Sequence, residues 1–280
     1  DAAAAFNLLA TSSQTMRGTA VSGAGGIGAG IAGSISVHGL VAATRAAVQP
    51  GARINQTVPS VNPNQSVQIR AIDNTVVIGR AGTLAGGGLA GVGAGAELGV
   101  LLKNTQAILG GAVGANGDII VRATSSEDVS SIAGAASLSV LSTIAGAGSA
   151  YRLDLTTQAY VDSGAVVRTL GSILISAEQN DELDLIGGSA NAALGTAAGA
   201  SLTAANVDKV TEAFVAAADG TRALPAAIVT AEGGGSGVTA NNGAFNITCG
   251  AENGGPFEVT TPSIVGTLVV EDIMMRWSYG

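Results

Sequence analysis

Polar and apolar residues alternate in short runs along most of this chain. Residues 182–186 read Glu-Leu-Asp-Leu-Ile, and β-branched residues are concentrated at 173–177. An alternation with a period of two is typical of β-strands that are half-buried. The apolar stripe with a period of 3.6 and a charged opposite face, which marks a surface helix, is missing. The pattern therefore predicts an all-β protein.

The strand-like runs repeat along the chain. Three related segments are SVQIRA from Ser66, DIIVRA from Asp118 and SILISA from Ser172, at spacings of 52 and 54 residues. A weaker copy, AAIVTA, begins at Ala226, again 54 residues on, and a degenerate one, AFNLLA, begins at Ala5. The first spacing is 61 because it includes the extra loop PSVNPNQ. A period in this range indicates a repeat architecture.

A second marker repeats in step with the first. It reads TRAAV, TQAIL, TQAYV and TEAFV, beginning at Thr44, Thr105, Thr157 and Thr211. Gly, Asn and Asp punctuate the segments between markers, as at Asn116-Gly117 and Asn180-Asp181, and such pairs favour turns. Short strands joined by tight turns at a fixed repeat predict a β-solenoid, in which each coil hydrogen-bonds to the next. A unit of about 53 residues is then two or three coils.

The repeat also predicts which side chains form the core. Ile69, Val121, Ile175 and Val229 occupy equivalent positions in successive units. We expect all four to be buried on the same sheet. Residues 1–231 form the β-solenoid in this interpretation, and 232–280 form an irregular C-terminal segment.

The consensus in TQAYVDSGAVVRTLGSILISAEQNDELDLIGGSA (157–190), which recurs at 105–137, resembles the β-strand repeats of very large Gram-negative surface proteins. These proteins include the filamentous-haemagglutinin-like and leukotoxin-like filamentous adhesins. The resemblance covers roughly residues 5–231. It implies the shaft of a right-handed parallel β-helix that is exported to the bacterial cell surface. It carries over no binding residues, because the shared motif is structural.

Composition fits sheets that pack closely together. The chain has 42 glycines, while aromatic residues are 3% and charged residues 11%. Small inward side chains let two or three sheets approach one another. Residues 18–44, 129–151 and 185–207 are free of charge and long enough to cross a bilayer as helices. Their many Gly, Ala, Ser and Thr residues make transmembrane helices the weaker interpretation.

Candidate chemistry is sparse. GAGGIG at 23–28 and GGGLAG at 86–91 match the spelling of a dinucleotide loop, but no helix with an acidic partner follows either. We therefore expect no cofactor. The net charge of −8 and the lack of a basic cluster argue against nucleic-acid binding. With one cysteine, neither an internal disulfide nor a cysteine-built zinc site is possible.

Two features could in principle support catalysis. His38 is the single histidine, and its apolar surroundings favour a structural residue of a turn or coil over a base or a metal ligand. The densest acidic cluster is Glu178, Asp181, Glu182 and Asp184. Alternation places Glu182 and Asp184 on one strand face, opposite Leu183 and Leu185. Because the preceding unit carries Glu127 and Asp128 at analogous positions, we interpret the cluster as a solvated face.

Large side chains gather near the C-terminus. Residues 232–280 are expected to cap the end of the solenoid or to form an interface, and aromatic, Met and Arg side chains are enriched in interfaces. The candidate residues are Phe257, Met274, Met275, Arg276, Trp277 and Tyr279. The N-terminal edge, beginning DAAAAF, is expected to be open to a preceding coil of a longer chain or to another copy.

The sequence thus predicts a non-enzymatic structural protein, without catalytic or metal-binding residues. The leading hypothesis is a shaft or fibre section of an extracellular bacterial adhesin, which could contact a host surface or matrix ligand. The alternative is a self-assembling extracellular filament or sheath subunit. A β-helical carbohydrate-active enzyme is a third hypothesis, based on the paired carboxylates.

Overall fold

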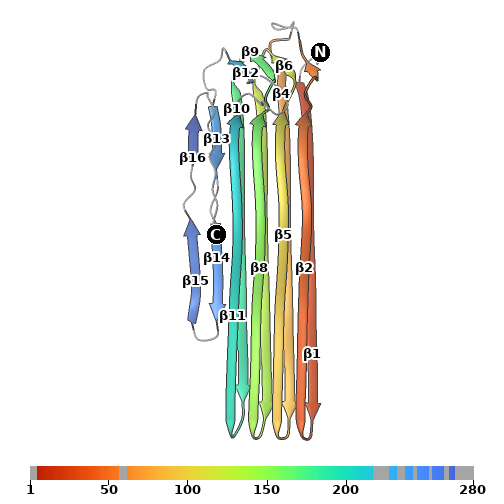
Figure 1. The fold of residues 1–280 in the computed structure, drawn as a ribbon, viewed down its shortest axis with the longest axis vertical. Helices are drawn as coiled ribbons and strands as arrows, with labels where there is room; N and C mark the ends of the chain where they lie inside the picture. The colour runs from red at the N-terminus through yellow and green to blue at the C-terminus, as the bar shows by residue number, and fades with distance from the viewer. Residues whose placement is uncertain are drawn as a thin grey trace.

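The computed structural model describes residues 5–56, 62–216, 227–231, 237–241, 245–251, 254–261 and 265–268, and every regular element in these ranges is a β-strand. Three sheets are formed (Figure 1). Sheet A contains β1 (Ala5–Gly26), β4 (Ser66–Gly87), β7 (Ile119–Ser139) and β10 (Ile173–Ala192). Sheet B contains β2 (Ala29–Val48), β5 (Ala90–Leu109), β8 (Ser142–Val161) and β11 (Thr196–Val215). Sheet C contains β3 (Arg53–Ile54), β6 (Ala112–Ala115), β9 (Val166–Thr169) and β12 (Ile228–Ala231).

The chain is a parallel β-solenoid. Each coil consists of a long strand of sheet A, a tight turn, a long strand of sheet B and a short strand of sheet C, and successive coils pair in parallel. One unit of about 53 residues is therefore one coil, and the prediction of two or three coils was wrong. The error has a physical cause, because Asn180-Asp181 was interpreted as a turn but continues the alternation inside β10.

The strand register confirms both repeat markers. Val67, Ile119 and Ile173 lie side by side in sheet A, and Leu8 of the degenerate first copy pairs with Ile69. In sheet B the four marker threonines are direct neighbours: Thr44, Thr105, Thr157 and Thr211. Side chains at equivalent positions of successive coils therefore stack in rows.

Most of the extra length of the first repeat lies in one connection. β3 ends at Ile54 and β4 begins at Ser66, whereas β6 ends at Ala115 and β7 begins at Ile119. On both sides of this longer connection the residue-by-residue register is kept. Coils of different length thus pair without a slip in any long strand.

The predicted core positions are confirmed for three residues and corrected for the fourth. Ile69, Val121 and Ile175 are aligned in sheet A and are at most 1% exposed. Val229 instead pairs with Val167 in sheet C, and the residue aligned with Ile175 is Val238. The segment AAIVTA resembles the earlier copies in composition, but its last four residues, Ile228–Ala231, form the short third strand of its coil.

Residues after 231 add strands to sheet A. β13 (Gly237–Asn241) and β14 (Phe245–Ala251) pair in parallel with β10, while β15 (Gly254–Thr261) and β16 (Val265–Leu268) pair antiparallel to β14 and β13. The backbone of Phe257 lies in β15, opposite Cys249. The other candidate interface residues lie outside the described residues: Met274, Met275, Arg276, Trp277 and Tyr279.

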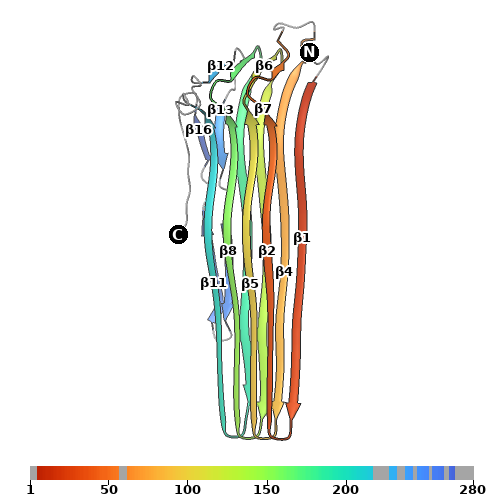
Figure 2. The same ribbon diagram turned by 45° about the vertical axis from the view of Figure 1, so that its right-hand side comes forward.

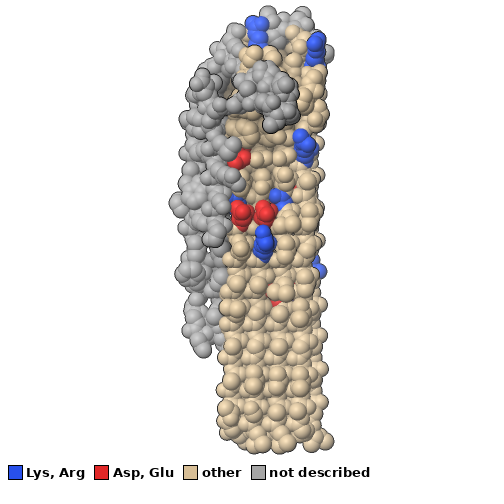
Figure 3. Space-filling view, viewed as in Figure 1, with Lys and Arg blue, Asp and Glu red and all other residues tan. Residues whose placement is uncertain are grey.

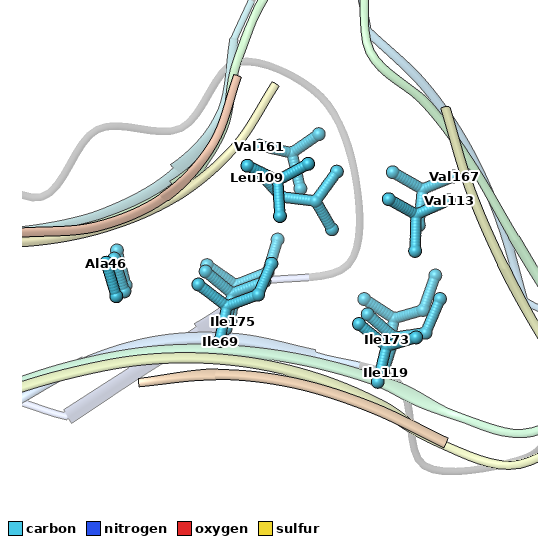
Figure 4. Close-up of a cluster of buried hydrophobic side chains, with 14 of the residues drawn as sticks. Ala46, Ile69, Leu109, Val113, Ile119, Val161, Val167, Ile173 and Ile175 are labelled. Atoms are coloured by element: carbon cyan, nitrogen blue, oxygen red, sulfur yellow. The ribbon is translucent and has the colours of Figure 1, made fainter. Parts of the chain in front are cut away.

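The two ends of each coil are packed differently. Where the three sheets meet, which we call the corner end, aliphatic side chains fill a wide interior (Figure 4). Ile69 and Ile175 of sheet A lie below Leu109 and Val161 of sheet B in this view. Each row is stacked from coil to coil. The corner end therefore has the large branched core that is usual in globular proteins.

At the opposite end the two long sheets run side by side into four tight turns (Figure 2). We call this the turn end and define it as residues 21–35, 82–96, 134–148 and 188–202. Its buried cluster contains alanine only. A Cβ built on Gly95 lies 2.6 Å from the carbonyl oxygen of Gly134 in the facing sheet. Glycine is therefore required there because the two backbones approach so closely, as the composition predicted.

Candidate functional site

The interior contains a layer of charged side chains between its two ends. The Lys103 Nζ lies 2.5 Å from Asp73 Oδ1 and 2.6 Å from Glu127 Oε1, and it donates a hydrogen bond of 2.7 Å to Thr75 Oγ1. Thr44 Oγ1 donates to the other oxygen of Asp73 at 2.7 Å. Lys103, Asp73 and Glu127 are all buried. Sheet A supplies the carboxylates and sheet B supplies the ammonium group.

The next coils repeat this arrangement with different residues. Lys209 Nζ of β11 lies 2.8 Å from Asp181 Oδ2 of β10 and donates to the backbone oxygen of Gln179 at 3.2 Å. Asp181 and Glu127 are direct neighbours in sheet A. The ionic layer, defined as Asp73, Lys103, Glu127, Asp181 and Lys209, thus continues from coil to coil.

A proton on Glu127 would balance the charge of this layer. Burial raises the pKa of the Glu127 carboxyl well above its usual value, and the hydrogen bond and repulsion from Asp181 raise it further, against the attraction of Lys103. With Glu127 protonated, two ammonium groups face two carboxylates. The layer is then neutral, which lowers the cost of keeping it away from water.

A second polar cluster lies closer to the turn end. His38 Nε2 of β2 lies 2.8 Å from Glu97 Oε1 of β5, and the Tyr151 hydroxyl of β8 donates to the same oxygen at 3.2 Å. Burial raises the pKa values of the Glu97 carboxyl and the Tyr151 phenol. Gly79 and Gly99 make room, because a Cβ at either position would collide with Glu97 or Tyr151.

His38 is therefore an interior residue of a strand, paired with a carboxylate. A histidine hydrogen-bonded to a carboxylate is also the pair that orients a catalytic base. His38 and Glu97 are only 7% and 0% exposed, and the facing sheet covers them. Inside the described ranges, no three His, Cys, Asp or Glu side chains are grouped so that they could hold a metal ion. This pair is best interpreted as part of the packing.

The acidic cluster noted in the sequence is divided between the two faces of sheet A. Glu182 is exposed and Asp184 is half-buried on the outer face, whereas Leu183 and Leu185 are buried. Asp181 is also buried. The interpretation as a solvated face holds for Glu182 and Asp184 and is wrong for Asp181. It is wrong for Glu127 as well, because Glu127 and Asp181 face Lys103 and Lys209.

The alternation in the sequence contains a signal for this layer. Asp181 lies two residues before Leu183 in the same strand, so alternation alone places both on the inner face. Lys103 and Lys209 each lie two residues before a marker threonine, at the position that Leu155 occupies in the intervening coil. Both lysines of the chain are thus found at inward positions.

The two glycine motifs lie at the same turn in adjacent coils, offset by two residues in the strand register. Residues 23–28 and 86–91 each include the end of a sheet A strand and its turn into sheet B. Gly88 donates to the oxygen of Gly26, and Leu89 donates to that of Gly28. These motifs form neighbouring turns that hydrogen-bond to each other, and neither precedes a helix.

The outer surface of the turn end carries no charged side chain. The charged residues nearest to the turns are Arg80 and Glu97, each seven residues from the turn-side end of its strand. Glu97 faces the interior, so the outward charge-free height is about 23 Å at a rise of about 3.3 Å per residue. Figure 3 shows this uncharged region on the sheet B face, with the charged side chains gathered nearer to the corner end.

Large aliphatic side chains project from this uncharged surface. Each of the four turns presents at least one of them to solvent: Ile27 is 98% exposed, Leu89 57%, Leu141 55% and Leu194 89%. Ile31, Leu84, Leu138 and Ile144 extend this surface along the adjoining strands. An exposed apolar surface of this kind is typical of an interaction site.

Comparison with protein-family models, with curated protein sequences and with solved structures finds no match for this chain. In the part of the chain that the structure describes, no helix is long and apolar enough to cross a membrane.

Proposed function

We propose that this chain is a non-enzymatic structural segment of a bacterial cell-surface adhesin, in which stacked coils form the shaft. The supporting observation is the register. Four coils pair residue for residue along both long sheets. A fold of this kind grows by adding coils, because each coil contacts only its neighbours. A shaft that holds a binding tip away from a cell surface can be lengthened by adding coils in this way.

The interior also supports a structural role. Its ion pairs join the two sheets or neighbouring strands of sheet B, and both sheets cover them. These pairs therefore stabilise the stacking of coils and are not accessible to a substrate. Buried charges that must find specific partners favour one register over others. A shaft needs such a device, because repeated coils of similar sequence can otherwise slip.

The experiment is to duplicate one coil. A chain with residues 66–117 inserted a second time before Ser66 should fold with an axial length increased by about 4.8 Å and an unchanged cross-section. Small-angle scattering measures the axial length and the cross-section. Denaturant unfolding tests whether the longer chain folds. A duplicated chain that aggregates or unfolds at lower denaturant than the original would contradict the shaft proposal.

The filament alternative is favoured by one specific observation. Among the described residues, β1 and β2 have no strand on their outer edges, and Phe6 and Leu8 of β1 are only half-buried. Such an edge can pair with a preceding coil or with another copy. Sedimentation over a concentration series distinguishes a filament subunit from a section of a shaft. Growth that Leu8→Lys abolishes indicates a filament subunit, and a monomer at all concentrations supports the shaft.

A further inference from the structure

We propose that the turn end inserts shallowly into the surface of a lipid membrane. This inference is independent of the adhesin proposal and rests on the four apolar turns. Ile27, Leu89, Leu141 and Leu194 lie in consecutive coils at the extreme end of the long sheets. Together they form an apolar edge at the extremity of the molecule.

Several backbone groups of these turns are already hydrogen-bonded from coil to coil. Leu89 donates to the oxygen of Gly28, Ser142 donates to that of Leu89, and Thr196 donates to that of Leu141. The Ser139 hydroxyl is bonded within its own turn, at 2.5 Å to the Ser142 oxygen. The transfer of a polar group from water to an apolar phase is unfavourable mainly when the group has no hydrogen-bond partner. The turns can therefore enter an apolar phase while keeping these bonds.

The distribution of charge matches that of a membrane surface. The acyl region of a bilayer contains no charge that could pair with a side chain, and the outward charge-free height of the turn end is about 23 Å. Amphipathic segments that lie in the interface bury their apolar side to a depth of about 5–10 Å. Arg80, the nearest outward charge, therefore stays in water or among the headgroups.

The depth is limited by the strand edges. Among the described residues, the turn-end parts of β2 and β11 have no strand on one side. Unpaired N–H and C=O groups are strongly disfavoured in hydrocarbon. Deep or spanning insertion is therefore unfavourable, and the turns with their adjoining residues are the part that enters.

A second copy of this chain fits the turn end less well. Four strands at about 4.8 Å and two sheets at about 10 Å give an end face of roughly 200 Å². A stable protein interface buries about 800 Å² on each partner. Contact between two turn ends is thus too small for a stable dimer, whereas a membrane surrounds the turns and also covers their flanks.

The test is flotation of the chain with vesicles of zwitterionic phosphatidylcholine, because the net charge of −8 disfavours anionic lipid. The wild-type chain should bind, with little dependence on salt. The double variant Leu89→Asp/Leu141→Asp should bind at least tenfold less, because it replaces two inserted apolar side chains with charged ones. The matched control is Val41→Asp/Leu102→Asp, on neighbouring outward positions of sheet B far from the turns. It should bind like the wild type.

Circular dichroism and thermal melting establish that both double variants fold. If the aspartate pair at the turns does not fold, Leu89→Ser/Leu141→Ser replaces it and should still weaken binding. Three results would overturn the proposal. They are a wild type that does not float with vesicles, an equal loss in the control pair, and a concentration-dependent dimer that the turn variants abolish in the absence of lipid.

Discussion

The corner end and the turn end are built from the same strands, but they achieve stability in different ways. At the corner end, stacked Ile, Val and Leu rows fill a wide interior. At the turn end, alanine and glycine bring the two sheets together, and backbone atoms approach across the interior. The corner end is stabilised by large side chains that fill its interior, whereas the turn end needs small side chains so that its two sheets can approach each other. One repeated sequence thus contains two kinds of core, separated by the ionic layer.

The largest expected effect is a charge in the aliphatic core. Val121→Asp at the corner end should destabilise the chain by more than about 4 kcal/mol, because it buries a carboxylate without a partner. Urea unfolding followed by circular dichroism measures the loss. The control is Thr124→Asp, a half-buried outward position of the same strand, which should change stability by less than about 1 kcal/mol. Equal effects of the two would mean that the inner face is misassigned.

Removing a charge from the boundary between the two regions should have the next largest effect. Lys103→Met leaves Asp73 without its ammonium partner and should cost about 3–5 kcal/mol. Arg122→Met is the control, because Arg122 and Glu178 form an ion pair 2.6 Å long on the outer face, where the arginine is 46% exposed. That exposed pair should contribute at most about 1 kcal/mol. Chemical denaturation of both variants at pH 7 tests this difference.

A single methyl group tests the turn end directly. Gly95→Ala pushes a Cβ against the oxygen of Gly134 and should cost about 1–3 kcal/mol through overpacking. Gly134→Ala has open space around its Cβ, so it should be neutral or slightly stabilising. Thermal unfolding of the two variants distinguishes them. If Gly95→Ala were as stable as the wild type, the sheets would have to be farther apart than described.

The smallest effect is a dependence on pH. Because burial raises the pKa of Glu127, the folded chain keeps a proton that the unfolded chain releases above its ordinary pKa of 4.5. The contribution of Glu127 to the free energy of unfolding should therefore be largest below that pH and fall as the pH rises through the folded pKa, by at most about 1.4 kcal/mol per pH unit.

Glu127→Gln removes this proton from the balance, while Glu97, whose pKa is also raised by burial, keeps its own contribution. Urea unfolding between pH 5 and pH 8 should give a shallower slope for the variant than for the wild type. An unchanged slope would show that Glu127 does not hold the proton.

Much of this fold could be predicted from the sequence, because stacked coils repeat their side chains. The threonine markers are neighbours in sheet B, and SVQIRA, DIIVRA and SILISA are neighbours in sheet A, as the spacing predicted. The number of coils per unit could not be predicted in this way. Glycine and asparagine, which usually mark turns, are tolerated inside these strands because both neighbouring coils hold their backbone in place.

The interior chemistry was harder to predict because a charged residue in a sequence suggests the surface. Lys209 is fully buried, and its charge is compensated by Asp181 from another strand. Such partners lie far apart in the chain, and only the parity of the alternation connects them. The C-terminal candidate residues, apart from the backbone of Phe257, lie outside the described residues, so their role as a cap or interface stays a prediction.

The longer connection between β3 and β4 shows where this architecture tolerates change in length. A single-residue insertion within a long strand reverses the inward and outward assignment of every following side chain in that strand. Between Ile54 and Ser66, extra residues are accommodated while the register on both sides is kept. Insertions and deletions can therefore accumulate at this corner during evolution without disturbing the stack. The same position is the natural attachment point for a grafted epitope or a fused domain.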